Sequence, residues 1–190
     1  MRIIGGRARG LHLAPVGDGD ATAQLRPTSD RVREAIFNLL INGKVAQSGD
    51  PVTGARVLDL FAGTGALGLE AMSRGAVHAT FVDDGRVARA LIKRNIDLMR
   101  AGDDAVFMAG NAAALPPNRG AGFDLVFLDP PYGKSLGQAA IASCLAGNWL
   151  APDALIVWEE SSAIPPPPGF TLLDQRRYGD TFVTMIRMQK

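Results

Sequence analysis

The chain has 190 residues, of which 47% are apolar and 21% charged, and its formal net charge is +1. A chain of this length can bury the core of one large domain without cross-links, and its composition excludes intrinsic disorder. One cysteine, Cys144, and two histidines exclude a disulfide framework and favour no metal site, so we expect a cytoplasmic protein. No apolar run approaches the length of a membrane span, and because no exposed apolar stripe is evident we expect a monomer.

The amino-terminal segment combines glycine with arginine. Residues 2–4 and 11–13 are short apolar segments, and the glycine-rich stretch between them carries Arg7 and Arg9, a pattern that predicts a hairpin. Residues 1–44 hold seven Lys or Arg and four acids, a net charge of +3, which leaves −2 for the rest of the chain. This excess could contact phosphates or could be solvated surface, and the charge alone favours neither.

The first predicted helix follows a segment, residues 16–24, that has the composition of a loop. Thr28 or Ser29 can cap the helix and Gly43 can end it. Apolar residues at helical spacing predict that one face of the helix is buried. We assign residues 1–50 to an extension, made of the hairpin and this helix, that precedes the main domain.

Strand and helix patterns alternate through residues 51–190, which we assign to the main domain. The predicted strands cover residues 56–60, 76–82, 105–109, 123–128 and 155–158. The predicted helices cover residues 67–74, 86–100 and 137–145, and residues 170–175 and 181–188 form a closing pair of strands. This alternation is typical of the α/β class with a Rossmann-like, doubly wound, mostly parallel sheet and an antiparallel closing strand.

A glycine-rich turn follows the first strand. Gly63, Gly65 and Gly68 have the spacing G-x-G-x-x-G before a helix, and Asp83 ends the second strand 20 residues beyond Gly63, which is typical of a site for an adenosine-bearing cofactor. Asp59, just before the turn, would repel a pyrophosphate but attract the ammonium group of S-adenosyl-L-methionine. The sequence therefore favours this cofactor over a nicotinamide dinucleotide.

Asn111 follows the third strand, where its amide could hydrogen-bond an adenine edge or, equally, cap a short helix. The residues that we assign to the cofactor are Asp59, Phe61, Gly63, Thr64, Gly65, Asp83, Asn111 and Asp129.

Asp129, Pro130, Pro131 and Tyr132 follow the fourth strand, at the end of the strand where ligands bind in open α/β sheets. The prolines restrict the backbone so that the Asp129 side chain and the Pro130 carbonyl can accept the two N–H groups of one planar amine, while Tyr132 stacks on its ring. Catalysis would then consist of alignment and of stabilising the charge that develops on nitrogen, without a metal ion. These four residues are the predicted catalytic group of a nucleobase N-methyltransferase.

Five further residues have simpler interpretations. Cys144, Trp149 and Trp158 are expected to be core residues. Glu159 and Glu160, at the end of the fifth strand, could form a rim of the site, but we expect them to be solvated charges.

These segments resemble a known family. Residues 57–68 together with residues 129–132 are similar to class I methyltransferases that modify exocyclic amines, and residues 2–6, 26–38 and 178–181 resemble the RsmD family. The resemblance implies methylation of the N2 amine of guanine 966 in 16S ribosomal RNA, with the 30S small ribosomal subunit or its assembly intermediate as partner. It also implies that RNA phosphates are contacted by Arg7, Arg9, Arg26, Arg31 and Arg33.

Other functions stay open. The methylated group could be adenine in DNA or RNA, or the amide of a protein glutamine. The chain could also be a non-catalytic RNA-binding module, although the intact Asp59 and Asp129 favour an enzyme.

Overall fold

The computed structural model describes residues 1–15 and 29–189, so the predicted loop over residues 16–24 and Arg26 lie outside the described residues. The strands are β1 (Arg56–Leu60), β2 (His78–Asp83), β3 (Ala105–Ala109), β4 (Phe123–Leu128), β5 (Leu150–Glu160), β6 (Phe170–Tyr178) and β7 (Thr181–Met188). The α-helices are α1 (Asp30–Asn42), α2 (Ala66–Ser73), α3 (Arg86–Met99) and α4 (Leu136–Ala146), and the short 3₁₀ helices are η2 (Lys44–Ser48), η3 (Gly102–Asp104) and η4 (Ala112–Ala114).

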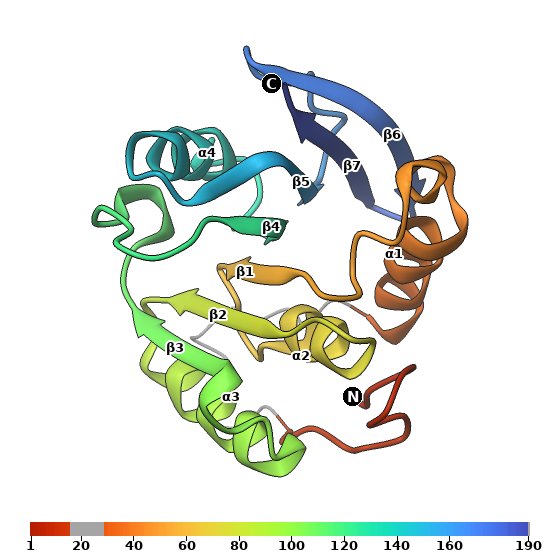
Figure 1. The fold of residues 1–190 in the computed structure, drawn as a ribbon, viewed down its shortest axis with the longest axis vertical. Helices are drawn as coiled ribbons and strands as arrows, with labels where there is room; N and C mark the ends of the chain where they lie inside the picture. Colours follow the sequence, from red (N-terminus) through yellow and green to blue (C-terminus); the bar gives the residue numbers. More distant parts are fainter. Residues whose placement is uncertain (16–28, 190) are drawn as a thin grey trace.

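The strands form one sheet in the order β3-β2-β1-β4-β5-β7-β6 (Figure 1). The first five strands of this order are parallel, and β7 and β6 are antiparallel to their neighbours. The predicted mostly parallel sheet with an antiparallel closing pair is therefore confirmed. β5 is longer than the predicted strand at both ends: Leu150 pairs with Phe123 of β4 at its start, and Glu160 pairs with Phe182 of β7 at its carboxyl end.

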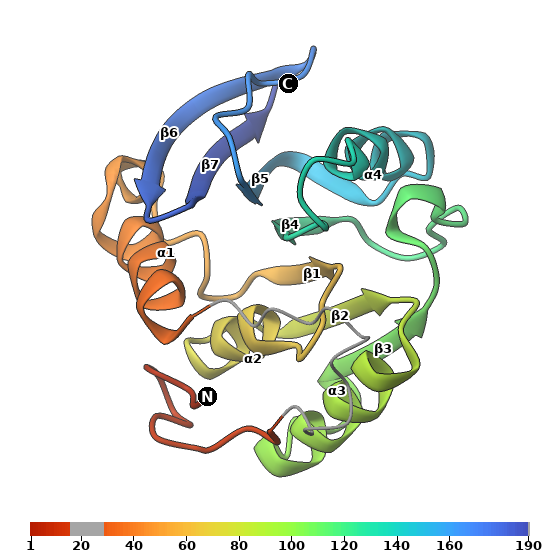
Figure 2. The same cartoon turned by 180° about the vertical axis from the view of Figure 1, so that it is seen from behind.

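Two hydrophobic layers cover the sheet. Alternate residues of a strand point to opposite faces, so Val57 of β1 packs in one cluster and Leu58 in the other. The first cluster receives side chains of α1, α2 and α3, and the second receives α4 and η4 (Figures 1 and 2). Because α2 leaves β1 on one face and α4 leaves β4 on the other, the carboxyl ends of these adjacent strands lie at the switch point where open α/β sheets bind ligands.

The amino-terminal segment packs into the first layer beside α2 (Figure 2). An antiparallel bridge joins Arg2 to His12, which confirms the predicted hairpin. Ile3 and Leu13 of the hairpin are 0% and 5% exposed within the cluster that also contains Val57 of β1. The extension and the main domain thus share one hydrophobic core.

The caps of α1 agree with the sequence pattern. The Ser29 hydroxyl accepts a hydrogen bond from the Val32 amide, and the Gly43 amide donates to the Leu39 carbonyl at the end of the helix. Of the two predicted cap residues, Ser29 is therefore the N-cap.

Candidate active site at the carboxyl edge of the sheet

The end of β4 lies directly beside the end of β1. Leu60 is opposite Leu128 in the parallel register, and the Asp129 amide donates to the Leu60 carbonyl over 3.4 Å. The predicted base-binding residues therefore begin next to the turn that was predicted to hold the cofactor. The fold brings these two groups together although about 65 residues separate them in the chain.

The turn after β1 has a left-handed backbone at three positions, a conformation that glycine adopts more readily than other residues. Gly63 and Gly65 have φ of 55° and 75°, and Phe61 has φ of 57°, a left-handed conformation that is uncommon for a bulky residue. A Cβ on Gly68 would lie 2.5 Å from the Phe81 ring and 3.1 Å from the Asp59 carboxylate. Glycine at position 68 therefore lets α2 pack closely against β1 and β2.

Asp59 is the most buried carboxylate of this edge, with 2% of its surface exposed. Its Oδ2 accepts a hydrogen bond from the Gly68 amide over 2.9 Å. Burial raises the pKa of Asp59 well above its usual value; the Gly68 amide opposes this rise, and the negative charges of Asp129 and Asp83 add to it. Three acidic side chains thus interact at one place, which favours an organic cation between them.

Asp83 connects the ends of two loops. Its Oδ2 accepts from the Gly63 amide over 2.9 Å and its Oδ1 from the Gly85 amide over 2.8 Å. Burial raises the pKa of Asp83, whereas these two amides lower it. The side chain is thereby held in one orientation at the end of β2, and each oxygen retains a lone pair for a ligand hydroxyl.

Asn111 is the N-cap of η4, where its Oδ1 accepts from the Ala113 amide over 2.8 Å. The capping interpretation is confirmed, and the contact with an adenine stays a prediction. The Gly110 amide donates to the Asp83 carbonyl over 3.2 Å, so Asn111 lies next to the end of β2. Thr64 is buried, and its carbonyl accepts from Asn95 over 2.8 Å.

Tyr132 is held by the closing strands. Its hydroxyl lies 3.1 Å from the Thr181 hydroxyl at the start of β7. Burial raises the pKa of Tyr132 to about 12; the bond to Thr181 opposes the rise, and Asp129, Glu159 and Glu160 add to it. The ring is therefore a neutral phenol at physiological pH, with one end fixed. Sequence reasoning missed Thr181 as its partner.

The expectation that Glu159 and Glu160 are solvated is wrong, since they are 3% and 6% exposed. β5 continues beyond its apolar run, so both glutamates lie within the strand and pair with β7, which buries them. Glu160 Oε1 accepts from the Gly133 amide over 3.3 Å and from the Ser161 amide over 2.8 Å. Glu160 thus supports the loop that carries residues 129–132.

The expected core residues are confirmed as such. Cys144, Trp149 and Trp158 are between 1% and 5% exposed. Burial raises the pKa of Cys144 to about 12, so its thiol is not an activated nucleophile.

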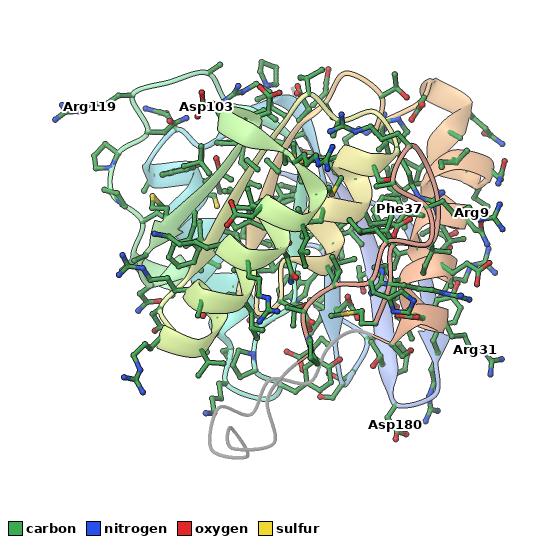
Figure 3. All side chains as sticks on the ribbon, turned by 90° about the horizontal axis from the view of Figure 1, so that it is seen from below. Arg9, Arg31, Phe37, Asp103, Arg119 and Asp180 are labelled. Carbon is green, nitrogen blue, oxygen red and sulfur yellow. The ribbon has the colours of Figure 1, made fainter. Side chains whose placement is uncertain are left out.

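The four predicted RNA-contacting arginines within the described residues divide into two groups. Arg7, Arg9 and Arg31 are exposed, and Figure 3 shows Arg9 and Arg31 projecting from the same side of the molecule. The prediction for Arg33 is wrong, because this side chain is 0% exposed. Its guanidinium donates to the Arg2 carbonyl and to Asp30 Oδ1, so it faces the hairpin and cannot reach a phosphate.

Glu70 explains the position of Arg33 and of the hairpin. This carboxylate on α2 is 0% exposed and accepts hydrogen bonds from the Ile4 and Gly5 amides over 2.8 Å each. It also forms ion pairs with Arg74, at 2.7 Å, and with Arg33, at 3.7 Å. The backbone of the glycine-rich hairpin is thereby anchored to α2, the helix that follows the glycine turn after β1.

Among the described residues, no group of three or more His, Cys, Asp and Glu side chains could hold a metal ion. None of the helices in the described ranges is both long and apolar enough to span a membrane.

Comparison with known proteins agrees with this geometry. Residues 1–187 match a family described as conserved hypothetical protein 95. The chain belongs to this family. Its curated relatives include ribosomal RNA small subunit methyltransferase D of Escherichia coli (strain K12), which is 38% identical over 170 residues, with 88% of this chain and 79% of the relative covered.

A second curated relative confirms the resemblance to the RsmD family. Ribosomal RNA small subunit methyltransferase D of Haemophilus influenzae is 35% identical over 184 residues, with 94% of this chain and 89% of the relative covered. The solved structure of the Escherichia coli protein yhhF has a TM-score of 0.82 at 34% identity, with 100% of this chain and 98% of that chain covered. The present chain, a member of the family, has the Rossmann-like class I methyltransferase fold.

Proposed function

We propose that this chain transfers a methyl group from S-adenosyl-L-methionine to the exocyclic N2 amine of a guanine in 16S ribosomal RNA, guanine 966 by resemblance to the RsmD family. One observation carries the proposal: the amide of Asp129 bonds the end of β1, so a motif suited to a planar amine adjoins the glycine turn of a class I methyltransferase fold. The family relatives named as ribosomal RNA small subunit methyltransferase D support the RNA substrate.

The residues of this edge fit the cofactor. S-adenosyl-L-methionine supplies an electrophilic methyl group on a positively charged sulfur. The interaction of Asp59 with Asp83 and Asp129 makes the edge electronegative, which suits this charge and that of the ammonium group. Asp83, oriented by two amides, suits the ribose hydroxyls. The residues proposed to hold the cofactor are Asp59, Phe61, Gly63, Thr64, Gly65, Asp83, Asn111 and Asp129.

The reaction then needs a precise orientation of the base. The guanine leaves its stack to reach the sheet edge. The Asp129 carboxylate and the Pro130 carbonyl accept its two amine N–H groups, and the ring of Tyr132 stacks on the base. Both interactions direct the nitrogen lone pair toward the cofactor and stabilise the positive charge that develops on nitrogen. The proton then leaves to Asp129 or to water.

The partners follow from this proposal. Residues 1–50 act as the RNA-contacting extension and residues 51–190 as the catalytic domain, although both share one core. Arg7, Arg9 and Arg31 contact phosphates of 16S ribosomal RNA, in the 30S subunit or in an assembly intermediate, in the cytoplasm. The enzyme acts as a monomer.

A labelling experiment tests the function. The protein is incubated with methyl-labelled S-adenosyl-L-methionine and with small ribosomal subunits that lack the modification, and the RNA is digested to nucleosides. Label in N2-methylguanosine is the expected result, and a parallel sample cleaved to oligonucleotides should carry the label in the fragment that contains position 966. Label in adenosine, in protein or in no product contradicts the proposal.

Asp59→Asn should stabilise the cofactor-free protein and weaken cofactor binding. The folded protein raises the pKa of Asp59, so the carboxyl binds its proton more tightly in the folded state than in the unfolded state. The protonated carboxyl of Asp59 therefore stabilises the folded state below pH 3.8, the ordinary pKa of aspartate. This stabilisation is lost as the pH rises through the raised pKa of the folded state. Asparagine keeps an oxygen for the Gly68 amide but carries no charge.

Urea unfolding between pH 4 and 8 and calorimetric titration with the cofactor measure both effects. Near pH 7 we expect a higher unfolding free energy and at least about tenfold weaker cofactor binding, which corresponds to loss of about 1.4 kcal/mol. Equal cofactor affinity in both proteins would remove Asp59 from the cofactor site.

A further inference from the structure

The outward face of α3 is basic. The helix buries Ala88, Leu91, Ile92, Asn95 and Met99 against the sheet. Four cationic residues of the helix are exposed, and we call them the α3 basic face: Arg86, Arg89, Lys93 and Arg94. Asp97 is the only acidic residue in the helix. None of these four cations belongs to the predicted RNA-contacting group.

The position of these charges is unfavourable for the helix itself. Arg86 and Arg89 lie in its first turn, which has no acidic residue, and cations there oppose the helix dipole. Arg86 and Arg89 are three residues apart, and Arg89 and Lys93 four, so like charges are neighbours on the surface. Within the described residues, the α3 basic face forms no ion pair. An anionic partner would offset the repulsion between these cations. Exposure to solvent alone does not explain why the cations are placed at the start of the helix.

The α3 basic face precedes the one acidic residue of the helix, Asp97, along the chain. The helix begins just after Asp83 at the carboxyl edge of the sheet and ends near η3, which contains Asp103 and Asp104. In Figure 3, Asp103 lies at the end of the molecule opposite Asp180, and Asp180 belongs to the β6–β7 turn at the carboxyl edge. Arg86 and Arg89 therefore lie in the half of α3 that adjoins the candidate active site, and Lys93 and Arg94 follow just past the middle of the helix.

The candidate site lies between two cationic surfaces. α3 packs on β2 and β3, at one side of β1 and β4. α1, whose exposed Arg31 lies in its first turn, packs on the other side, where Phe37 contacts Phe127 of β4 with ring centroids 5.7 Å apart. Both helices cover the same face of the sheet. A polyanion that crosses the end of β1 and β4 would meet cations on each side.

We propose that the α3 basic face binds phosphates of the substrate RNA on the side of the target base opposite Arg31. The inference rests on the proposed function and adds a second RNA contact surface to it. A regular row of cations, about one helical turn apart, suits a phosphate backbone and requires no particular base sequence. A ribosomal protein is the other class of partner that could meet this surface, and the experiment separates the two.

The test uses the full chain and two charge-matched pairs of substitutions. Arg89→Glu with Lys93→Glu reverses two charges of the α3 basic face. Arg100→Glu with Arg119→Glu reverses two exposed charges at the opposite edge, where Figure 3 shows Arg119. Binding of a fluorescein-labelled RNA duplex of unrelated sequence, and of unmodified small subunits, is measured between 50 and about 200 mM salt.

For the α3 pair we expect the dissociation constant for both probes to rise at least about tenfold and the log–log salt slope to fall by about 2, because two phosphate contacts are lost. Cofactor affinity should stay within twofold, which shows that the active site is intact. The control pair should bind RNA like the parent. Arg89→Gln with Lys93→Gln, which introduces no negative charge, should show the same reduction in slope.

Three results would overturn the inference. They are unchanged RNA binding by the α3 pair, equal weakening by the control pair, and weakening toward small subunits alone, which would indicate a protein contact. Failure of the proposed function is distinguishable, because the parent protein would then place no label in N2-methylguanosine.

Discussion

Asp129→Ala is expected to lower the rate of methyl transfer by about two orders of magnitude or more while changing cofactor affinity no more than a few fold. The substitution removes an acceptor that aligns the amine and stabilises its developing charge, and single contacts of this kind contribute about 10²- to 10³-fold. The rest of the site should persist, since the Asp129 backbone still bonds the end of β1. Single-turnover kinetics with saturating RNA measure the effect.

Two comparisons make this result specific. Asp129→Asn keeps one acceptor oxygen and should retain more activity than the alanine variant. Asp180→Ala removes an exposed carboxylate from the same edge of the sheet (Figure 3) and should keep the parental rate. Unchanged turnover in Asp129→Ala would mean that Asp129 does not hold the reacting amine.

Glu70→Ala should lower the free energy of unfolding by about 3–5 kcal/mol, because the buried Arg33 guanidinium loses its buried counter-charge and keeps only the exposed Asp30, and because the ion pair with Arg74 is also lost. The Ile4 and Gly5 amides would also lose their acceptor. For a chain of this size the melting temperature should fall by roughly 10 °C. Urea unfolding gives the free energy, and RNA titration should show weaker binding as the hairpin detaches from α2.

Glu34→Ala is the matched control, since Glu34 is an exposed acid of α1; its effect should stay within about 0.5 kcal/mol. Glu70→Gln retains one acceptor oxygen and should cost less than the alanine variant. A loss below about 1 kcal/mol in Glu70→Ala would show that the hairpin is held mainly by apolar contacts of Ile3 and Leu13.

The local sequence pattern predicted most helices and strands, because the apolar periodicity and the turn residues of each segment favour the element that the segment forms in the fold. Residues 56–60, 105–109, 123–128 and 181–188 form strands with the predicted limits; two of these strands are followed directly by turn-forming residues, Gly110 and Asp129. β5 was predicted too short, because Pro152 and Asp153 interrupt its apolar pattern at the start while two glutamates follow Trp158 at the end.

The position of the candidate site also follows from local information. Asp59 and Asp129 each lie at the end of an apolar strand, and parallel strands present these ends at one edge. Alternation with helices was enough to predict that β1 and β4 are parallel. That they are direct neighbours, with Asp129 bonded to Leu60, is a property of the folded sheet.

The sequence by itself determined the α/β class, the glycine turn and the residue types that suit a cofactor and an amine, because strand and helix periods and turn chemistry act within a few residues. Only the tertiary structure decided which charged groups are buried. Arg33 has the pattern of a surface residue but meets Glu70, and Tyr132 meets Thr181, across 37 and 49 positions of the chain. Periodicity reports which face of an element is apolar, whereas a buried charge or hydroxyl is stable only with a partner that the packing of distant elements supplies.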